Sequence, residues 1–178
     1  FRLNLPVTLV QDLKVKGDNL IAATSGRAIW ILDDLAVLRQ YNKADSSLRL
    51  YQPVDMILLT GSSELDGSDD SFTGTHPFRG VNPATGITLY YQLPDVKAGE
   101  AITLEIQDAQ QKTVRVISSV KDSTYKKYDG GPGPEPVLPA KKGLNRFVWD
   151  LRHAIMPGVP DVYIESSYAG HKAIPGNY

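Results

Sequence analysis

Residues Leu13 to Asp34 read LKVKGDNLIAATSGRAIWILDD, and this stretch decides how the chain begins to fold. Apolar and charged residues alternate from 13 to 16, and Gly17-Asp18-Asn19 then tolerates the positive φ angles of a hairpin turn. An apolar run follows, and Ser25-Gly26-Arg27 turns the chain into segment 28–32. The pattern predicts three short antiparallel strands joined by tight turns.

A sheet of three such strands has little core of its own. Segment 28–32 is apolar on both faces, as expected of a strand that neighbouring sheets cover on each side. We therefore expect this sheet to pack against sheets like itself, as one blade does in a β-propeller.

The composition excludes several classes of function. Nineteen basic and twenty acidic side chains leave a formal net charge of −1, which argues against a nucleic-acid or membrane surface. Cysteine is absent, which rules out disulfides and thiolate metal sites. The sequence contains no apolar run near the roughly 20 residues that span a bilayer, so we expect no membrane insertion.

The middle of the chain changes character. Leu35, Leu38 and Tyr41 recur at spacings of three and predict a short amphipathic helix or turn, so residues 1–42 form the first predicted domain. A brief strand is expected over 48–52, within a linker and long polar loop that runs from 43 to 80.

Residues 81–178 carry the alternation of an antiparallel sandwich. Strands are expected over 87–93, 102–107, 114–116 and 146–152. In the third strand Val114 and Val116 are predicted to face inward and Arg115 outward. Trp149, in the fourth strand, is predicted to anchor the core of the sandwich. The sequence thus predicts an all-β chain, a partial propeller blade followed by a truncated immunoglobulin- or fibronectin-like sandwich.

Two stretches carry a resemblance to a known family. The run VQDLKVKGDNLIAATSGRAIWILDDLAVLRQY resembles the last blade of bacterial sortilin-like, BNR-repeat propeller proteins. Asn82-Pro83, Gly86, Tyr90-Tyr91, the LEIQDA run and GLNRFVWDLR at 143–152 resemble the sandwich that follows that propeller. Residues 143–150 also resemble the sandwich of flagellar hook-capping proteins.

The resemblance implies an exported protein, secreted or periplasmic, of a family commonly labelled glycosyl hydrolase or sialidase-like. Its partners would be the remaining blades of the same protein, together with a glycan or protein ligand. The chain departs from the family because it holds no Ser-x-Asp-x-Gly-x-Thr-Trp repeat. It opens on Phe1 and stops at Tyr178, where the family begins another strand, so we expect a carboxy-terminal piece with an incomplete sandwich.

Asp34 and Arg27 are the strongest catalytic candidates. A glycosidase needs two carboxyl groups roughly 5 to 9 Å apart, one of them protonated. Asp33 and Asp34 are adjacent at a strand end, however, where side chains diverge, and such residues more often cap the following helix. Arg27 lies in a tight turn, where a surface or loop-anchoring role is favoured over catalysis.

Metal and cofactor sites receive little support. Asp66, Asp69 and Asp70 offer oxygen ligands for calcium, but they lack the spacing and the closing glutamate of a calcium loop, which favours a solvated loop. The histidines at 76, 153 and 171 are far apart, with no paired ligand spacing, and are predicted to be merely polar. No cofactor is expected.

The tyrosines offer a possible platform on which sugar rings could stack. Their scatter through strands and loops favours ordinary packing or surface positions instead. The five concerned are Tyr90, Tyr125, Tyr128, Tyr163 and Tyr168.

The sequence favours a non-catalytic role for this segment, either structural or in binding a glycan or protein. One alternative is that it forms part of a sialidase-like glycoside hydrolase whose catalytic residues lie mainly in other blades, with Asp34 or Arg27 near the axis. Another is an independent carbohydrate-binding module.

Overall fold

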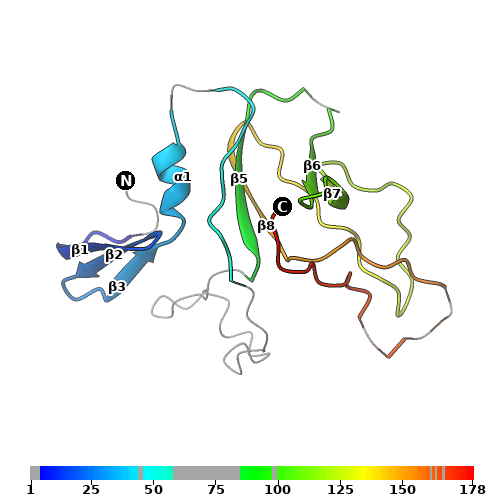
Figure 1. Ribbon diagram of the computed structural model, residues 1–178. Helices are drawn as coiled ribbons and strands as arrows, with labels where there is room; N and C mark the ends of the chain where they lie inside the picture. Colours follow the sequence, from blue (N-terminus) through cyan, green and yellow to red (C-terminus); the bar gives the residue numbers. More distant parts are fainter. Residues whose placement is uncertain are drawn as a thin grey trace. The chain divides into compact units, whose positions relative to one another are not determined.

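The computed structural model describes residues 5–43, 46–57, 85–97, 100–160, 162, 164–165 and 167–178. The chain divides into two compact units, one formed by 1–42 with 52–85 and the other by 43–51 with 86–178. The described residues are mostly strands in antiparallel sheets, with a single short helix among them, so the chain is all-β (Figure 1).

The first unit contains the predicted three-stranded sheet. Strands β1 (Val10–Lys16), β2 (Asn19–Thr24) and β3 (Ile29–Leu32) are antiparallel and adjacent in chain order. Leu13 pairs with Ala22, which pairs in turn with Trp30. Gly17 and Gly26 have φ angles of 59° and 73°, so the two turns use the conformational freedom that the sequence indicated.

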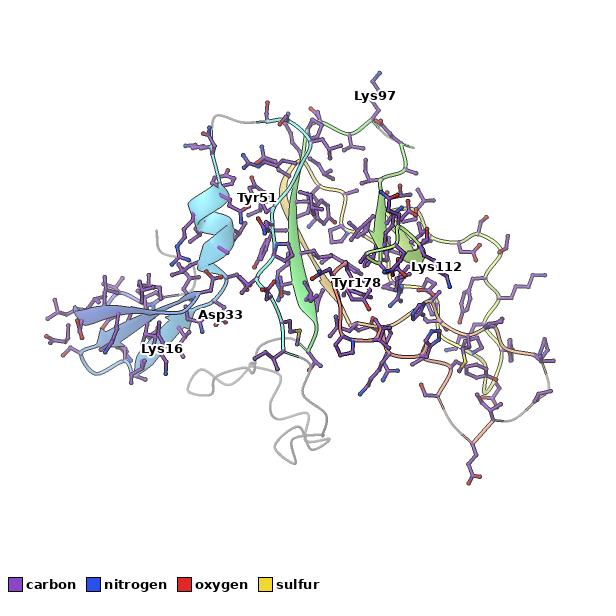
Figure 2. The ribbon with its side chains drawn as sticks, viewed as in Figure 1. Lys16, Asp33, Tyr51, Lys97, Lys112 and Tyr178 are labelled. Atoms are coloured by element: carbon purple, nitrogen blue, oxygen red, sulfur yellow. The ribbon has the colours of Figure 1, made fainter. Side chains whose placement is uncertain are left out.

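Both faces of this sheet expose large apolar side chains. Leu13 and Val15 lie on one face and are 59% and 54% exposed, whereas Ile29 and Ile31 lie on the other and are 67% and 58% exposed. Figure 2 shows side chains projecting from both sides of the sheet. Among the described residues of this unit, the buried apolar ones are Ala22 and Val37. The sheet therefore has very little core of its own.

A short helix follows the sheet. Helix α1 (Leu35–Gln40) is tied to the β1–β2 turn, because the Leu35 amide donates to the Asp18 carbonyl at 2.9 Å and Arg39 pairs with the Asp18 carboxylate at 3.0 Å. The side chain of Gln40 bonds to both the amide and the carbonyl of Gln52. These bonds hold the helix against the segments on either side of it in the sequence.

The second unit contains two small antiparallel sheets. Strands β4 (Arg49–Leu50), β5 (Ile87–Leu93) and β8 (Gly143–Trp149) form one, in that order, and β6 (Thr103–Gln107) and β7 (Thr113–Ser118) form the other. Residues 43–51 fall in the predicted linker, but they belong to this unit and contribute its edge strand β4. Residues 52–57 of the predicted linker belong to the first unit, and residues 44–45 and 58–80 lie outside the described residues.

The core of the second unit centres on Trp149. Trp149 and Tyr51 are each 2% exposed and Leu93 is 1% exposed. The Trp149 indole donates to the Arg152 carbonyl at 2.9 Å, which satisfies its one polar atom. A Cβ on Gly86, whose φ is 136°, would overlap the Trp149 carbonyl, so this position requires glycine. The predicted role of Trp149 as a core anchor is confirmed.

The prediction of which face of β7 is buried is wrong. Arg115 is 4% exposed, whereas Val116 is 53% exposed, so the arginine faces inward and the valine faces solvent. In the register with β6, Arg115 lies opposite Ile106, which is also buried. The arginine can occupy the buried face because two carboxylates and a carbonyl bind it there.

Gln92 of β5 also departs from simple alternation. It lies between the buried Tyr91 and Leu93, yet it is itself only 5% exposed, and its side-chain oxygen accepts a hydrogen bond from the Tyr51 hydroxyl at 2.8 Å.

Within the described part of the chain, no helix is long and apolar enough to span a lipid bilayer.

Replacing Trp149 tests the core of the second unit. We expect Trp149→Ala to lower the free energy of unfolding by about 3 to 5 kcal/mol, because the substitution leaves a large cavity and removes the indole hydrogen bond to the Arg152 carbonyl. Denaturant melts of the purified chain measure the loss. As a control, Leu144→Ala removes a side chain that is 44% exposed on the same strand and should cost under about 1 kcal/mol. Equal losses in the two variants would contradict the assignment.

Candidate functional site

A buried arginine organises the irregular half of the second unit. Arg115 donates to the Asp150 carboxylate at 2.7 Å, to the Glu135 carboxylate at 2.8 Å and to the Arg152 carbonyl at 3.3 Å. The buried Nε of Arg115 has no hydrogen-bond partner among the described residues. The guanidinium on β7 thus holds both the loop around Glu135, 20 residues further along the chain, and the segment that begins at Asp150, 35 residues further along.

The two carboxylates are only partly covered. The side chains of Glu135 and Asp150 are 41% and 51% exposed. Glu135 also accepts the Ile155 amide at 2.5 Å, and Asp150 accepts the Arg152 amide at 3.2 Å. Each carboxylate therefore joins the buried guanidinium to a backbone segment and still presents oxygen to solvent.

The carboxy-terminal segment Tyr168–Ala173, here called the strap, pairs with residues 151–156. The His153 amide donates to the His171 carbonyl at 3.0 Å, and the Met156 amide donates to the Tyr168 carbonyl at 2.8 Å. Arg152 also reaches the Gly170 carbonyl at 2.8 Å. A Cβ on Gly170 would overlap the His153 carbonyl, so this close pairing depends on glycine.

Two of the three histidines meet across this pairing. The rings of His153 and His171 are stacked, with centroids 3.8 Å apart and an angle of 19° between their planes. Desolvation by burial lowers the pKa of His153, and the nearby charges of His171 and Lys112 lower it further. The prediction that these histidines lack convergent partners is wrong for this pair, while His76 lies outside the described residues.

Three of the candidate tyrosines also come together. Burial raises the pKa of Tyr128, and the proximity of Tyr168 and then of Tyr125 adds to that effect. A Cβ on Gly131 would overlap the Tyr128 ring, and the Tyr125 hydroxyl donates to the Pro132 carbonyl at 2.9 Å. Tyr90 lies apart from them on β5, and Tyr163 is outside the described residues.

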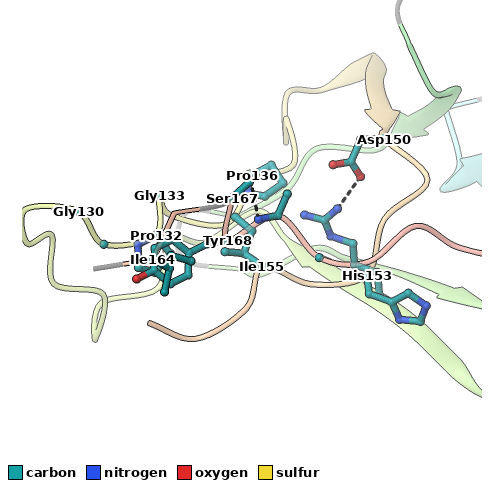
Figure 3. Close-up of a pocket in the computed structure, with 14 residues that line it drawn as sticks. Gly130, Pro132, Gly133, Pro136, Asp150, His153, Ile155, Ile164, Ser167 and Tyr168 are labelled. Carbon is teal, nitrogen blue, oxygen red and sulfur yellow. Dashed lines mark hydrogen bonds and ion pairs between the residues drawn. The ribbon is translucent and has the colours of Figure 1, made fainter. Parts of the chain in front are cut away.

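A hollow of about 640 Å³ lies between these groups. Its walls come from the loop 130–136, from residues 150–155 and from residues 164–170, with Arg115 among the lining side chains. Figure 3 shows Asp150 and His153 at one end and Pro132, Ile164 and Tyr168 toward the other. The hollow thus combines a charged end with an apolar wall.

The structure does not bring Arg27 and Asp34 together. Arg27 precedes β3 and Asp34 follows it, so the four residues of the strand, at roughly 3.3 Å each, separate them. The exposed Arg27 contributes its carbonyl, which accepts the Trp30 indole at 2.7 Å and so stabilises the turn.

Asp34 occupies the N-cap position of α1, but the expected side-chain capping bond is not formed. The residue has φ 59° and ψ 44°, a left-handed conformation, whereas a capping residue normally has an extended one. Its carbonyl instead accepts the Val37 amide at 3.2 Å.

The calcium candidates Asp66, Asp69 and Asp70 lie outside the described residues. Among the residues that the structure describes, no three histidine, aspartate or glutamate side chains are grouped so as to hold a metal ion.

Sequence reasoning missed Arg115, Glu135 and Asp150. The one available signal was the pairing of a charged residue with a strand that is otherwise apolar, at Val114-Arg115-Val116. Its acidic partners are too distant in the sequence to be identified without the fold.

The buried ion pair makes a direct prediction about stability. We expect Arg115→Ala to destabilise the second unit by about 2 to 4 kcal/mol, somewhat less than the roughly 3 to 5 kcal/mol for breaking a fully buried pair, because the half-exposed carboxylates can regain water. Arg115→Met, which keeps much of the apolar stem, should cost less. Thermal and denaturant melts compare the two, and an equal or larger loss in Arg115→Met would contradict the account.

The histidine pair predicts instability in acid. A lowered pKa means that the unfolded chain binds a proton more readily than the folded one, so stability is full above the ordinary histidine pKa of about 6.5. It should fall as the pH drops below that value and level off once His153 is protonated in the folded state as well. Melts across this range should show the slope, and His153→Phe, which keeps a stacked ring, should reduce it. An unchanged slope would contradict the prediction.

No protein-family model, curated protein or solved structure matches this chain.

Proposed function

We propose that the chain is a non-catalytic segment of an exported, sortilin-like propeller protein, with a structural and ligand-binding role. In this proposal the first unit is part of a propeller blade and the second is an immunoglobulin-like sandwich that follows it. The other blades of the same protein are then its main partners.

One observation carries the structural half of the proposal. The sheet β1–β2–β3 exposes large apolar side chains on both of its faces, with Leu13 and Val15 on one and Ile29 and Ile31 on the other. Exposed apolar patches in a folded protein mark surfaces that pack against something else. A blade fits this pattern because a propeller covers both faces of each sheet with its neighbours.

The catalytic alternative receives less support. Arg27 and Asp34 lie at opposite ends of β3. The exposed carboxylates of Glu135 and Asp150 both pair with the same guanidinium. A glycosidase needs one carboxyl protonated and the other ionised, in two distinct environments, and a shared cation does not provide that difference.

Charge placed on each face of the sheet tests the proposal. We expect the purified chain to self-associate as its concentration rises, since each sheet can cover another. The double variants Leu13→Lys/Val15→Lys and Ile29→Lys/Ile31→Lys should each reduce that association in analytical ultracentrifugation. Ile174→Lys is the matched control, because Ile174 is 79% exposed in the second unit, and it should leave association unchanged.

Two results would contradict the proposal. A chain that stays monomeric at every concentration would show that neither face needs a partner sheet. Hydrolysis of an aryl glycoside by the chain, lost in Asp34→Asn, would show that the segment is catalytic.

A further inference from the structure

The hollow beside Arg115 has the volume of a small-molecule site and is open to solvent. Its volume of about 640 Å³ falls within the roughly 300 to 1,000 Å³ that ligand pockets occupy. Such pockets combine an apolar lining with a few fixed polar groups. Here Pro132, Pro136, Ile155, Ile164 and Tyr168 provide the apolar side chains, and Asp150 with Arg115 provides the polar groups.

The polar groups of the hollow are held in place before any ligand arrives. Arg115 fixes Asp150 at 2.7 Å, and the Arg152 amide holds the same carboxylate oxygen at 3.2 Å. Half of the Asp150 side chain nevertheless remains exposed. A carboxylate held in this way is a strong hydrogen-bond acceptor that needs little reorganisation to receive a hydroxyl group.

The charges around the hollow do not favour an ionic ligand. Among the side chains that line it, Arg115 is positive and Asp150 is negative, and the two are paired at 2.7 Å, so their charges cancel. The guanidinium is also buried and already shared between two carboxylates, which leaves little to attract a phosphate or a carboxylate. A neutral ligand rich in hydroxyl groups fits this balance better than an anion or a cation.

The apolar wall contains an aromatic ring. Tyr168 lines the hollow, and Tyr128, whose pKa is raised in part by the nearby Tyr168, lies close to Gly131 and Gly158. An aromatic ring can present a flat apolar surface to one face of a sugar, whose C–H groups are apolar while its rim carries hydroxyls. The two ends of the hollow match these two parts of a sugar.

We propose that the hollow lined by Arg115, Asp150 and Tyr168 binds a neutral mono- or disaccharide, with a hydroxyl group donating to Asp150 and a ring face against Tyr168. This site deepens the ligand-binding half of the proposed function and lies wholly within the second unit. It is independent of the exposed sheet of the first unit.

Titration of the isotopically labelled 178-residue chain tests this site by NMR. The neutral probes are cellobiose and N,N′-diacetylchitobiose, and the charged probes are 3′-sialyllactose and trilysine. We expect amide shifts to centre on Gly131, Asp150 and Tyr168 and a neutral probe to bind at least about tenfold more tightly than either charged one. Tighter binding of 3′-sialyllactose or trilysine, or no shift with tens of millimolar neutral disaccharide, would overturn the proposal.

Two matched pairs of variants test whether binding takes place in this hollow, and the NMR spectrum of each variant without sugar shows whether it is folded. Asp150→Asn should weaken binding by roughly tenfold or more, since it removes a hydrogen bond to a charged acceptor. Its control is Asp95→Asn, because Asp95 also pairs with a cation, Lys142 at 2.9 Å, but does not line the hollow. Ile164→Ala, which trims the apolar wall, should weaken binding severalfold, and Ile174→Ala should leave it unchanged.

The outcomes also distinguish this proposal from the first one. Sugar binding by a chain that stays monomeric would support the site while contradicting the propeller role. Self-association without sugar binding would do the reverse. Equal effects of Asp150→Asn and Asp95→Asn would overturn the assignment to this hollow.

Discussion

The second unit depends on one buried cation. Beyond β7 the described chain forms a single further strand, β8, and the long segments before and after it are irregular. Arg115 joins them, because its guanidinium binds Glu135 in the first segment and Asp150 and the Arg152 carbonyl at the start of the second. A buried charge is tolerated only when its hydrogen bonds are made, so these contacts constrain all three segments at once.

The loops around Arg115 are rich in glycine and proline. Glycine is required at several points along them, because a side chain there would overlap a neighbouring residue. A Cβ on Gly131 or Gly158 would overlap Tyr128, and one on Gly170 would overlap the His153 carbonyl. Proline limits the number of conformations that the unfolded loop can adopt, which reduces the entropy lost when the loop is ordered. The loop composition therefore fits a segment that is ordered without strands.

The sequence predicted the elements whose burial follows a local period. Strand β6 alternates as expected, with Ile106 inward and Glu105 outward, and β8 buries Trp149. The prediction failed for β7, since Val-Arg-Val gives the same apolar and polar alternation whichever side is buried. The inward face of β7 carries Arg115 and Ile117, and the arginine is accommodated there by Glu135 and Asp150, which lie 20 and 35 residues away. The histidine stack and the tyrosine cluster were missed for the same reason, because each joins residues that only the fold brings together.

The strap forms part of the wall of the hollow and also carries one ring of the histidine stack. Ser167, Tyr168, Ala169 and Gly170 line the hollow, and the next residue along, His171, carries the ring that stacks on His153. Burial of His153, together with the nearby His171, lowers the pKa of His153, so protonation of this ring is disfavoured in the stacked arrangement. Tyr168, Ala169 and Gly170 of the strap form part of the wall, while Tyr168, His171 and Ala173 make the backbone hydrogen bonds with residues 151–156. The wall of the hollow and the pairing of the histidines therefore depend on one short segment.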